Sequence, residues 1–502
     1  MSTPRKSPKR PAVRTASAPA GRAVDRPADD EIWPRVTREL ADDLAVDALA
    51  RDRAGKAPFD EVARLQEAGL PALLTAPGPS RRGADWRAAC AVVREISAAD
   101  SSVGELLAHH YALSWSSRFF GPAHEAHTPY RADAPPETAA VPAPGTTPAP
   151  EDASGAESTS GTETASGTET ASGADGARRP GAAHRRPLAL DVCTAEERWL
   201  LAGGVEPPRA ASEPGLTLTP AEGSGGGWIL DGRRAFASGV TVADRLVVGA
   251  RPGGTGDLLV VLVDPAHPGV FTDAGTDRVG QRLAGAGTVT FDHVPVPPEH
   301  VLGVLPHDEH AVAPFTTLAP LALRLLLTQV GLGIAEGALA EARDISRADQ
   351  AGPVPAGGAG GPAAGDGTAP AGSGDDPYLL LAYGELATAA HAAAAVVERA
   401  TDALARGLHT EWSLTLEERA DISVLVAAAE TVTGRAAVHI TTRILELVDG
   451  TAGADSRGGG PGFDRFWRNA RALTAPTRAD HRLRDIGDHY LNGTHARLTL
   501  LA

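Results

Sequence analysis

The apolar residues of the chain follow three successive spacings, and this order restricts its fold more than any other feature. Between residues 30 and 120 they recur every three or four positions, as at Leu40 and Leu44, which indicates helices. From residue 216 short β-type runs alternate with Gly, Pro and Asp. After Pro320 the helical spacing returns almost to the end. The order predicts helices, then a sheet, then helices again.

Three tracts interrupt this pattern. Residues 1–29, 131–186 and 353–374 contain almost no large apolar residue, and the second includes a tandem Gly-Thr-Glu-Thr-Ala-Ser repeat. Segments of this composition cannot bury enough apolar area to offset the entropy lost on ordering. We therefore predict a disordered tail, a disordered insertion and a disordered loop, which leave about 395 of the 502 residues for packed structure.

The domain boundaries follow from these two observations. We predict an N-terminal helical domain over 30–201, a middle antiparallel β domain over 202–305 and a C-terminal bundle of four long helices over 306–502. The fold class is α+β with a majority of helix. After the insertion, the helical pattern is expected to resume from Ala195 to Leu201.

Two local patterns give finer expectations. Ser101 and Ser102 precede an apolar helical stripe, so we expect them to cap that helix. Asp231-Gly232 separates two short apolar runs, which predicts a hairpin turn.

Composition excludes several classes of protein. The chain has 47 basic and 63 acidic residues, a formal charge of −16, which argues against a nucleic-acid binder or a membrane-surface protein. No run approaches the ~20 apolar residues of a membrane span, and the basic start lacks the apolar region of a secretory signal. Cys90 and Cys193 are too few for a disulfide framework or a cysteine metal cluster, so we expect a cytoplasmic protein without a metal.

Several strings then point to one family. Arg-Arg-Ala-Phe-Ala-Ser-Gly-Val at 233–240 resembles the flavin-facing strand of the acyl-CoA dehydrogenase superfamily, and 291–297 resembles the end of its β domain. The strings at 462–469 and 490–493 resemble one branch, the dibenzothiophene monooxygenases and sulfur-acquisition oxidoreductases. The resemblance covers nearly all of the chain outside the three tracts.

The resemblance implies a bound flavin and names its contacts. The Ser238 hydroxyl would lie near the ring edge with Phe236 packing beside it, and Gly239 would let the ring approach. Arg347 and Arg457 lie where this branch places phosphate-binding arginines. The alternatives are an ordinary Ser-Gly turn and two surface arginines.

A missing carboxylate decides between two reactions. Acyl-CoA dehydrogenases need a positioned Glu as general base, which the superfamily places either in the C-terminal loop or on the first bundle helix. Here residues 472–477 and 321–325 supply none. The branch also places two histidines in that loop, where this chain has Leu473 and Pro476.

Oxygenation by reduced flavin and O₂ needs no such base, so we favour a monooxygenase that excludes water and holds a hydrogen-bonding group near the reacting oxygen. His110, on the helix that matches the branch's His-bearing helix, is the catalytic candidate. The alternative is an interior histidine bonded to a backbone carbonyl. His481 and His489 are expected to be solvated helix residues.

The leading hypothesis is thus a flavin-dependent monooxygenase that oxygenates a small hydrophobic substrate, with organosulfur compounds among the candidates. Reduced FMN would come from a separate reductase, because no Gly-rich dinucleotide fingerprint follows a strand. The resemblance also implies a homotetramer. The alternatives are an FAD-dependent acyl-CoA dehydrogenase with a relocated base, and a degenerate, non-catalytic flavin-binding homologue.

Overall fold

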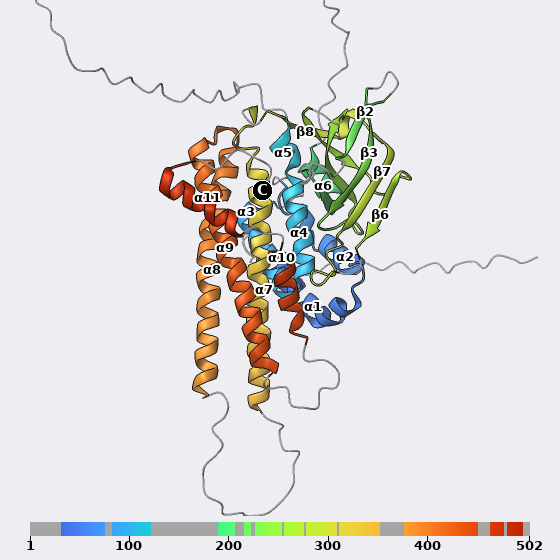
Figure 1. Cartoon of the computed structure of the whole chain (residues 1–502). Helices are drawn as coiled ribbons and strands as arrows, with labels where there is room; N and C mark the ends of the chain where they lie inside the picture. Colours follow the sequence, from blue (N-terminus) through green and yellow to red (C-terminus); the bar gives the residue numbers. More distant parts are fainter. Residues whose placement is uncertain are drawn as a thin grey trace, which may run out of the picture.

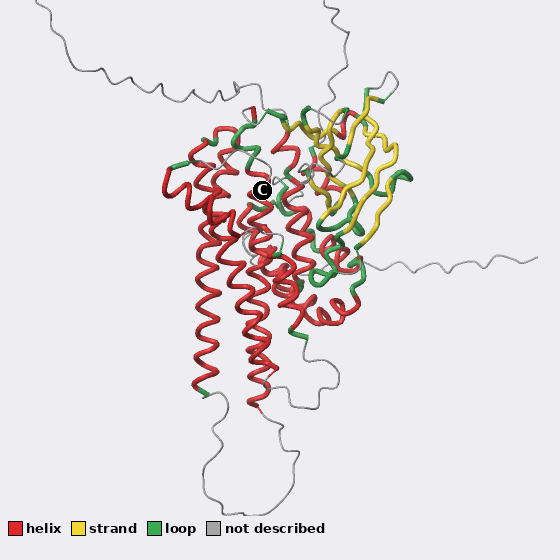
Figure 2. The backbone as a smooth tube through the Cα atoms, viewed as in Figure 1, coloured by secondary structure: helices red, strands yellow, loops and turns green. Residues whose placement is uncertain are grey.

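The computed structural model describes residues 32–75, 83–121, 189–205, 215–221, 226–253, 256–275, 278–308, 311–351, 376–449, 462–475 and 479–494. The three predicted low-complexity tracts lie outside these residues. In the described chain, helices come first, a sheet follows, and long helices return (Figures 1 and 2). The predicted class, mostly helical with an antiparallel-rich sheet, is confirmed.

The N-terminal region is built from short helices. They are α1 (Ile32–Ala54), α2 (Phe59–Glu67), α3 (Trp86–Ala99), α4 (Ser101–Ser114), α5 (Ser116–Phe120) and α6 (Leu190–Glu197), with the 3-10 turn η2 (Leu70–Ala72) after α2. Asp100 caps α4 by accepting hydrogen bonds from the backbone amides of Ser102 and Val103. The expected caps Ser101 and Ser102 are wrong, because the chain is already helical at Ser101.

The helix expected from Ala195 to Leu201 is wrong in its second half. α6 ends at Glu197, and β1 (Leu201–Gly204) begins four residues later. β1 pairs in parallel with β4 (Arg245–Pro252). Sheet pairing therefore overrides the apolar spacing at this point.

The described strands form one sheet in the order β6-β7-β3-β2-β4-β5-β8, with β1 also paired to β4. Neighbouring strands are antiparallel, except that β4 pairs in parallel with β1 and β2. The remaining strands are β2 (Thr217–Pro220), β3 (Trp228–Phe236), β5 (Leu258–Val263), β6 (Val270–Ala274), β7 (Gly287–Val296) and β8 (Val301–Leu305).

Asp231-Gly232 lies inside β3, so the predicted hairpin turn is wrong. β3 runs unbroken from Trp228 to Phe236 between β2 and β7. Its register with β7 shifts between Leu230 and Gly232, where Gly232 has a φ of 128°. The glycine forms a bulge instead of a turn because β7 pairs with β3 both before and after it, while β2 pairs with the residues before it.

The C-terminal region contains three long helices, α7 (Leu318–Ala351), α8 (Pro377–Thr410) and α9 (Leu416–Asp449), which lie side by side (Figure 1). The shorter α10 (Asp464–Thr474) and α11 (Ala479–Asn492) pack against α9, and α10 also contacts α7. α7 approaches α3 closely at Gly337, where a Cβ would lie 2.2 Å from the carbonyl oxygen of Ala98. One core cluster therefore joins both helical regions.

Two of the long helices differ in how much of them is covered. By length and composition both α7 and α8 could cross a membrane, although no run of the sequence was expected to do so. The apolar window of α7 is 78% buried inside the protein, whereas that of α8 is only 33% buried. α7 is therefore a core helix, and α8 carries an apolar face that the described residues leave open.

Candidate functional site

The turn after β3 brings together Ser238 and the 278–285 loop. The Ser238 Oγ donates to the carbonyl oxygen of Ala284 at 3.1 Å, and the backbone amide of Gly239 donates to the same oxygen at 2.7 Å. Ser238 is buried. Because its only hydroxyl proton is used, the Ser238 oxygen is left to accept a hydrogen bond from a ligand.

Gly239 is required here by backbone conformation and by packing. Its φ is 79°, in the left-handed region that favours glycine, and a Cβ would lie 2.6 Å from the Cβ of Ala202 on β1. Phe236 is buried beside the same strand, with its ring 3.7 Å from the position of a Cβ on Gly204. The structure therefore gathers the three predicted ring contacts at the ends of β1 and β3, and the approach of a flavin to them stays a prediction.

His110 ties α4 to two other segments. Its Nε2 donates to the carbonyl oxygen of Pro71 at 2.9 Å, and its Nδ1 accepts from the backbone amide of Leu201 at 3.0 Å. The ring is fully buried, and burial lowers its pKa to about 4 against the opposing effect of the Pro71 bond. This is the arrangement of an interior histidine bonded to a backbone carbonyl, the alternative raised for this residue. Its catalytic role stays a prediction.

A second face of α4 carries two ionisable residues that the sequence analysis missed. Glu105 and His109 follow Ser101 at four-residue spacing, so the three side chains share one face of the helix. The Ser101 Oγ donates to the Gln281 Oε1 at 3.2 Å, which places this face against the 278–285 loop. Two ionisable residues four positions apart in an otherwise apolar helix are a signal that the sequence does contain.

This Glu105–His109 pair is buried and incompletely bonded. Within the described residues, the Glu105 Oε2, the His109 Nε2 and the Gln281 Nε2 are buried without a hydrogen-bond partner. Buried polar groups in native proteins nearly always have a partner, from protein, water or ligand. Three such atoms where α4 meets one loop indicate a place that a ligand completes.

Arg278 sets the charge around the pair. Its guanidinium donates to the carbonyl oxygens of Ala237 at 3.3 Å and Gln281 at 3.4 Å. Burial raises the pKa of Glu105 to about 7, and the positive charge of Arg278 opposes that rise. Burial lowers the pKa of His109 to about 4, and Arg278 lowers it further. At neutral pH His109 is therefore uncharged, and Glu105 lies close to half protonation.

α10 closes the site from the other side. The Asn469 Oδ1 accepts from the backbone amide of Gln281 at 2.7 Å, and its Nδ2 donates to the Ser101 Oγ at 2.9 Å. A Cβ on Gly280 would lie 2.2 Å from the carbonyl oxygen of Arg468. The cavity beside Ser101 and Asn469 has a volume of only about 10 Å³, roughly the room for one water. The site is therefore packed against solvent on this side.

Of the two predicted phosphate arginines, the structure describes only Arg347. Arg347 is exposed near the end of α7, and its guanidinium has no partner among the described residues. It lies six residues beyond Glu341, which pairs with Arg465 on α10, so it is about 9 Å further along the helix axis. Arg457 lies outside the described residues.

The positions that could hold a dehydrogenase base stay without a carboxylate. On α7, Arg324 instead pairs with Glu430 of α9, its Nε 3.0 Å from the Glu430 Oε2. Leu473 is partly buried and packs beside Gly331, while Pro476 lies outside the described residues. On α11, His481 is exposed and the Nδ1 of the partly exposed His489 lies 3.2 Å from the carbonyl oxygen of Thr494.

The chemistry of these residues suits a flavin ring, and the contact itself stays a prediction. An isoalloxazine ring has a polar edge of carbonyl and imino groups beside apolar faces, and its polar edge matches the unpaired atoms of Glu105, His109 and Gln281. Two buried side chains are expected to contact the apolar face of the ring. Leu106 lies beside Gly239, and Phe236 lies beside Gly204 of β1. The structure thus brings together the predicted ring residues and the missed pair on α4, and leaves Arg347 apart from them.

No family model matches the chain. Two curated relatives cover most of it. A dibenzothiophene monooxygenase of Rhodococcus qingshengii is 28% identical over 487 residues, spanning 94% of this chain and 95% of the relative. A probable FMNH₂-dependent monooxygenase, SfnC, of Pseudomonas putida is 25% identical over 460 residues, spanning 91% and 94%.

Solved structures give the same picture. The dibenzothiophene monooxygenase TdsC of Paenibacillus sp. A11-2, solved with FMN and indole, superposes with a TM-score of 0.70 at 25% identity, covering 94% of this chain and 99% of that one. Butyryl-CoA dehydrogenase of Megasphaera elsdenii superposes with a TM-score of 0.61 at 16% identity, covering 92% and 98%, and this likeness concerns the fold alone.

Proposed function

We propose that this chain, which groups with the dibenzothiophene monooxygenase branch of the acyl-CoA dehydrogenase superfamily, is an FMN-dependent monooxygenase. The observation that carries the proposal is the Glu105–His109 pair, whose Oε2 and Nε2 atoms are buried without a hydrogen-bond partner among the described residues, on the helix whose Leu106 lies beside Gly239. Its substrate is a small hydrophobic molecule, and an organosulfur compound is the first candidate because relatives are named for dibenzothiophene.

Different residues contact the ring and the phosphate of FMN. The ring is contacted by Phe236, Ser238 and Gly239. The Ser238 hydroxyl already donates its proton to the carbonyl oxygen of Ala284, so its oxygen accepts a hydrogen bond from the ring. Arg347 and Arg457 are assigned to the phosphate. When bound, reduced FMN supplies the two electrons with which O₂ delivers one oxygen atom to the substrate and one to water.

The Glu105–His109 pair holds protons at the site. Glu105 can carry a proton on its Oε2 near neutral pH, because burial raises its pKa to about 7. His109 is uncharged at neutral pH, so its Nε2 can form a hydrogen bond to a ligand without placing a second positive charge beside Arg278. The closed contact of Asn469 with Gln281 and Ser101 keeps water away from both.

We infer a homotetramer in which Arg347 acts on the flavin of a neighbouring subunit. The apolar window of α8 is only 33% buried, and Tyr378, Leu380 and Leu381 are exposed near its start, which favours burial against another copy. Arg347 is exposed near the end of α7, so we assign its phosphate role to the flavin of a neighbouring subunit.

Two further assignments complete the proposal. A separate reductase supplies FMNH₂, because no Gly-rich dinucleotide fingerprint follows a strand of this chain. The site of action is the cytoplasm, which agrees with two cysteines that are not joined in a disulfide.

Oxygen-18 labelling tests the proposal. The protein is mixed with reduced FMN, ¹⁸O₂ and either dibenzothiophene or indole, and products are read by mass spectrometry. We expect one labelled oxygen atom per product molecule from at least one of the two compounds. Anaerobic incubation of the FAD-loaded protein with acyl-CoA thioesters of several chain lengths should leave the flavin oxidised. Bleaching by a thioester without oxygenated product would replace the proposal by the dehydrogenase alternative.

A further inference from the structure

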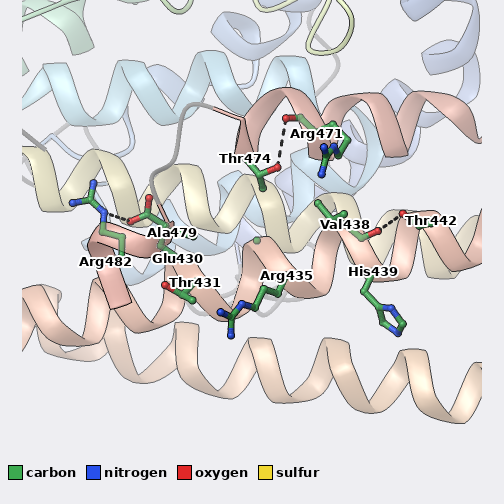
Figure 3. Close-up of a pocket in the computed structure, with 11 residues that line it drawn as sticks. Glu430, Thr431, Arg435, Val438, His439, Thr442, Arg471, Thr474, Ala479 and Arg482 are labelled. Atoms are coloured by element: carbon green, nitrogen blue, oxygen red, sulfur yellow. Dashed lines mark hydrogen bonds and ion pairs between the residues drawn. The ribbon is translucent and has the colours of Figure 1, made fainter. Parts of the chain in front are cut away.

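A cavity of about 540 Å³ lies between α9, α10 and α11, outside the site described above (Figure 3). Its volume is within the range of small-molecule sites, roughly 300–1,000 Å³. On α10 it is lined by Arg471, whereas Asn469 contacts Gln281; two residues apart on a helix, these side chains point about 200° from each other. The cavity and the Glu105–His109 pair are therefore on different sides of α10.

Arginines dominate the cavity. Arg435 of α9 and Arg471 of α10 lie on facing helices, with the Arg482–Glu430 pair at one end and His439 at the other (Figure 3). Arg435 and Arg471 have no hydrogen-bond or ion-pair partner in the part of the chain that the structure describes. Two free guanidiniums thus face one space.

The one carboxylate that lines the cavity does not neutralise them. The Glu430 Oε2 is already shared, 3.0 Å from the Arg324 Nε and 3.2 Å from the Arg482 Nε. The single negative charge of Glu430 is therefore already paired with two arginines, Arg324 and Arg482, and does not neutralise Arg435 or Arg471. The local charge is positive, in a protein whose net charge is −16.

The other described arginines of the same two helices have partners. On α9 Arg443 pairs with Glu446, and on α10 Arg465 pairs with Glu341 and Arg468 with Asp464. Arg435 and Arg471 are the exceptions, and both line the same cavity. Both side chains are exposed, so an anion can reach them from solvent, and an anion that binds to the folded protein would stabilise it.

Two threonines that line the cavity already donate their hydroxyl protons within the protein. Thr431 and Thr442 donate to the carbonyl oxygens of Ala427 and Val438 at 2.8 Å and 2.7 Å, within their own helix. They therefore offer mainly methyl groups, beside the side chain of Val438. Such walls suit the hydrocarbon part of a ligand, while the guanidiniums suit its oxyanion.

We propose that this cavity is a second ligand site, which takes a compact organic anion: a small hydrocarbon body that carries one sulfonate, sulfinate or carboxylate group. The oxyanion lies between Arg435 and Arg471, and the body packs on Val438 and the threonine methyl groups. Binding is independent of flavin.

Calorimetry on the flavin-free, full-length protein tests the site with benzenesulfonate as the probe. We expect one saturable site per chain and a rise of the unfolding temperature with benzenesulfonate concentration. The uncharged analogue methyl phenyl sulfone should bind at least tenfold more weakly. Arg435→Ala and Arg471→Ala should each weaken benzenesulfonate binding tenfold or more. Arg443→Ala, an arginine of α9 outside the cavity, is the matched control and should leave binding unchanged.

Three results would overturn the proposal. The first is equal binding of benzenesulfonate and methyl phenyl sulfone. The second is inorganic phosphate binding as tightly as benzenesulfonate, which would make the ligand an ion without an organic body. The third is displacement of benzenesulfonate by FMN, which would make the cavity part of the cofactor site. If an alanine variant fails to fold, Arg435→Gln and Arg471→Gln carry the same expectation.

Discussion

His109 and His110 are neighbours on α4 and are both buried, yet the protein uses them differently. Both ring nitrogens of His110 are bonded to backbone groups, one on the η2 turn and one on β1. The His109 Nε2 has no partner within the described residues and shares its face with the unpaired Glu105. Burial lowers the pKa of both histidines to about 4, so burial and pKa do not separate them. The hydrogen bonds separate them: His110 links α4 to the η2 turn and to β1, whereas the His109 Nε2 is left for the proposed ligand.

Replacing His110 should have the largest effect on stability. His110→Ala leaves the buried carbonyl of Pro71 and amide of Leu201 without a partner and opens a cavity, so we expect a loss of about 3 kcal/mol in the free energy of unfolding. Urea denaturation at pH 7 measures it. A loss under about 1 kcal/mol would remove the distinction between the two histidines.

Replacing Glu105 should change how stability depends on pH. Glu105 has a folded pKa of about 7, raised above its usual 4.5, so the buried carboxylate costs nothing below pH 4.5 and its full cost is present above pH 7. Glu105→Gln removes that cost. We expect the variant to match the parent near pH 4.5 and to exceed it by up to about 3 kcal/mol above pH 7. Equal stability of the two proteins at both pH values would contradict the raised pKa.

The same Glu105→Gln substitution should lower function while it raises stability, because the amide cannot supply a proton to the site. With reduced FMN and O₂, we expect a fall of tenfold or more in oxygenated product, with the missing electrons recovered as hydrogen peroxide. Glu61→Gln, a second buried carboxylate that instead faces Arg51, is the matched control and should not divert electrons to peroxide. Equal diversion in both variants would show that the effect does not depend on the position of Glu105 in the site.

Replacing His109 should have the smallest effect on stability. His109→Leu breaks no hydrogen bond at Nε2, so we expect a change within about 1 kcal/mol at pH 7. Because its folded pKa of about 4 lies below its usual 6.5, His109 reduces stability as pH falls through that interval. The variant should therefore lose less stability than the parent between pH 6.5 and pH 4. A loss at pH 7 as large as that of His110→Ala would break the comparison.

Much of the fold could be predicted because it depends on local spacing. The spacing of apolar residues predicted the order of helices, sheet and helices, which the structure has. The bulge at Gly232 could not be predicted in this way. An Asp-Gly pair specifies a turn only when the chain on either side is free to reverse, and here β2 and β7 hold β3 on both sides.

The candidate site was predictable only in part. The string around Ser238 pointed to the ends of β1 and β3, where these residues do gather. The spacing of Glu105 and His109 was visible, but their lack of partners depends on Gln281 and Arg278, which are distant in sequence. Likewise, nothing local pairs Arg435 with Arg471, because they meet only where α9 and α10 pack together.

The most direct test of the central claim, that this protein oxygenates with reduced FMN, is rapid mixing of the protein and reduced FMN with O₂, followed by absorbance. The proposal predicts a transient species whose spectrum differs from those of oxidised and reduced FMN, with a shorter life in Glu105→Gln than in Glu61→Gln. Reoxidation at the rate of free flavin, with no such species in the unmodified protein, would contradict it.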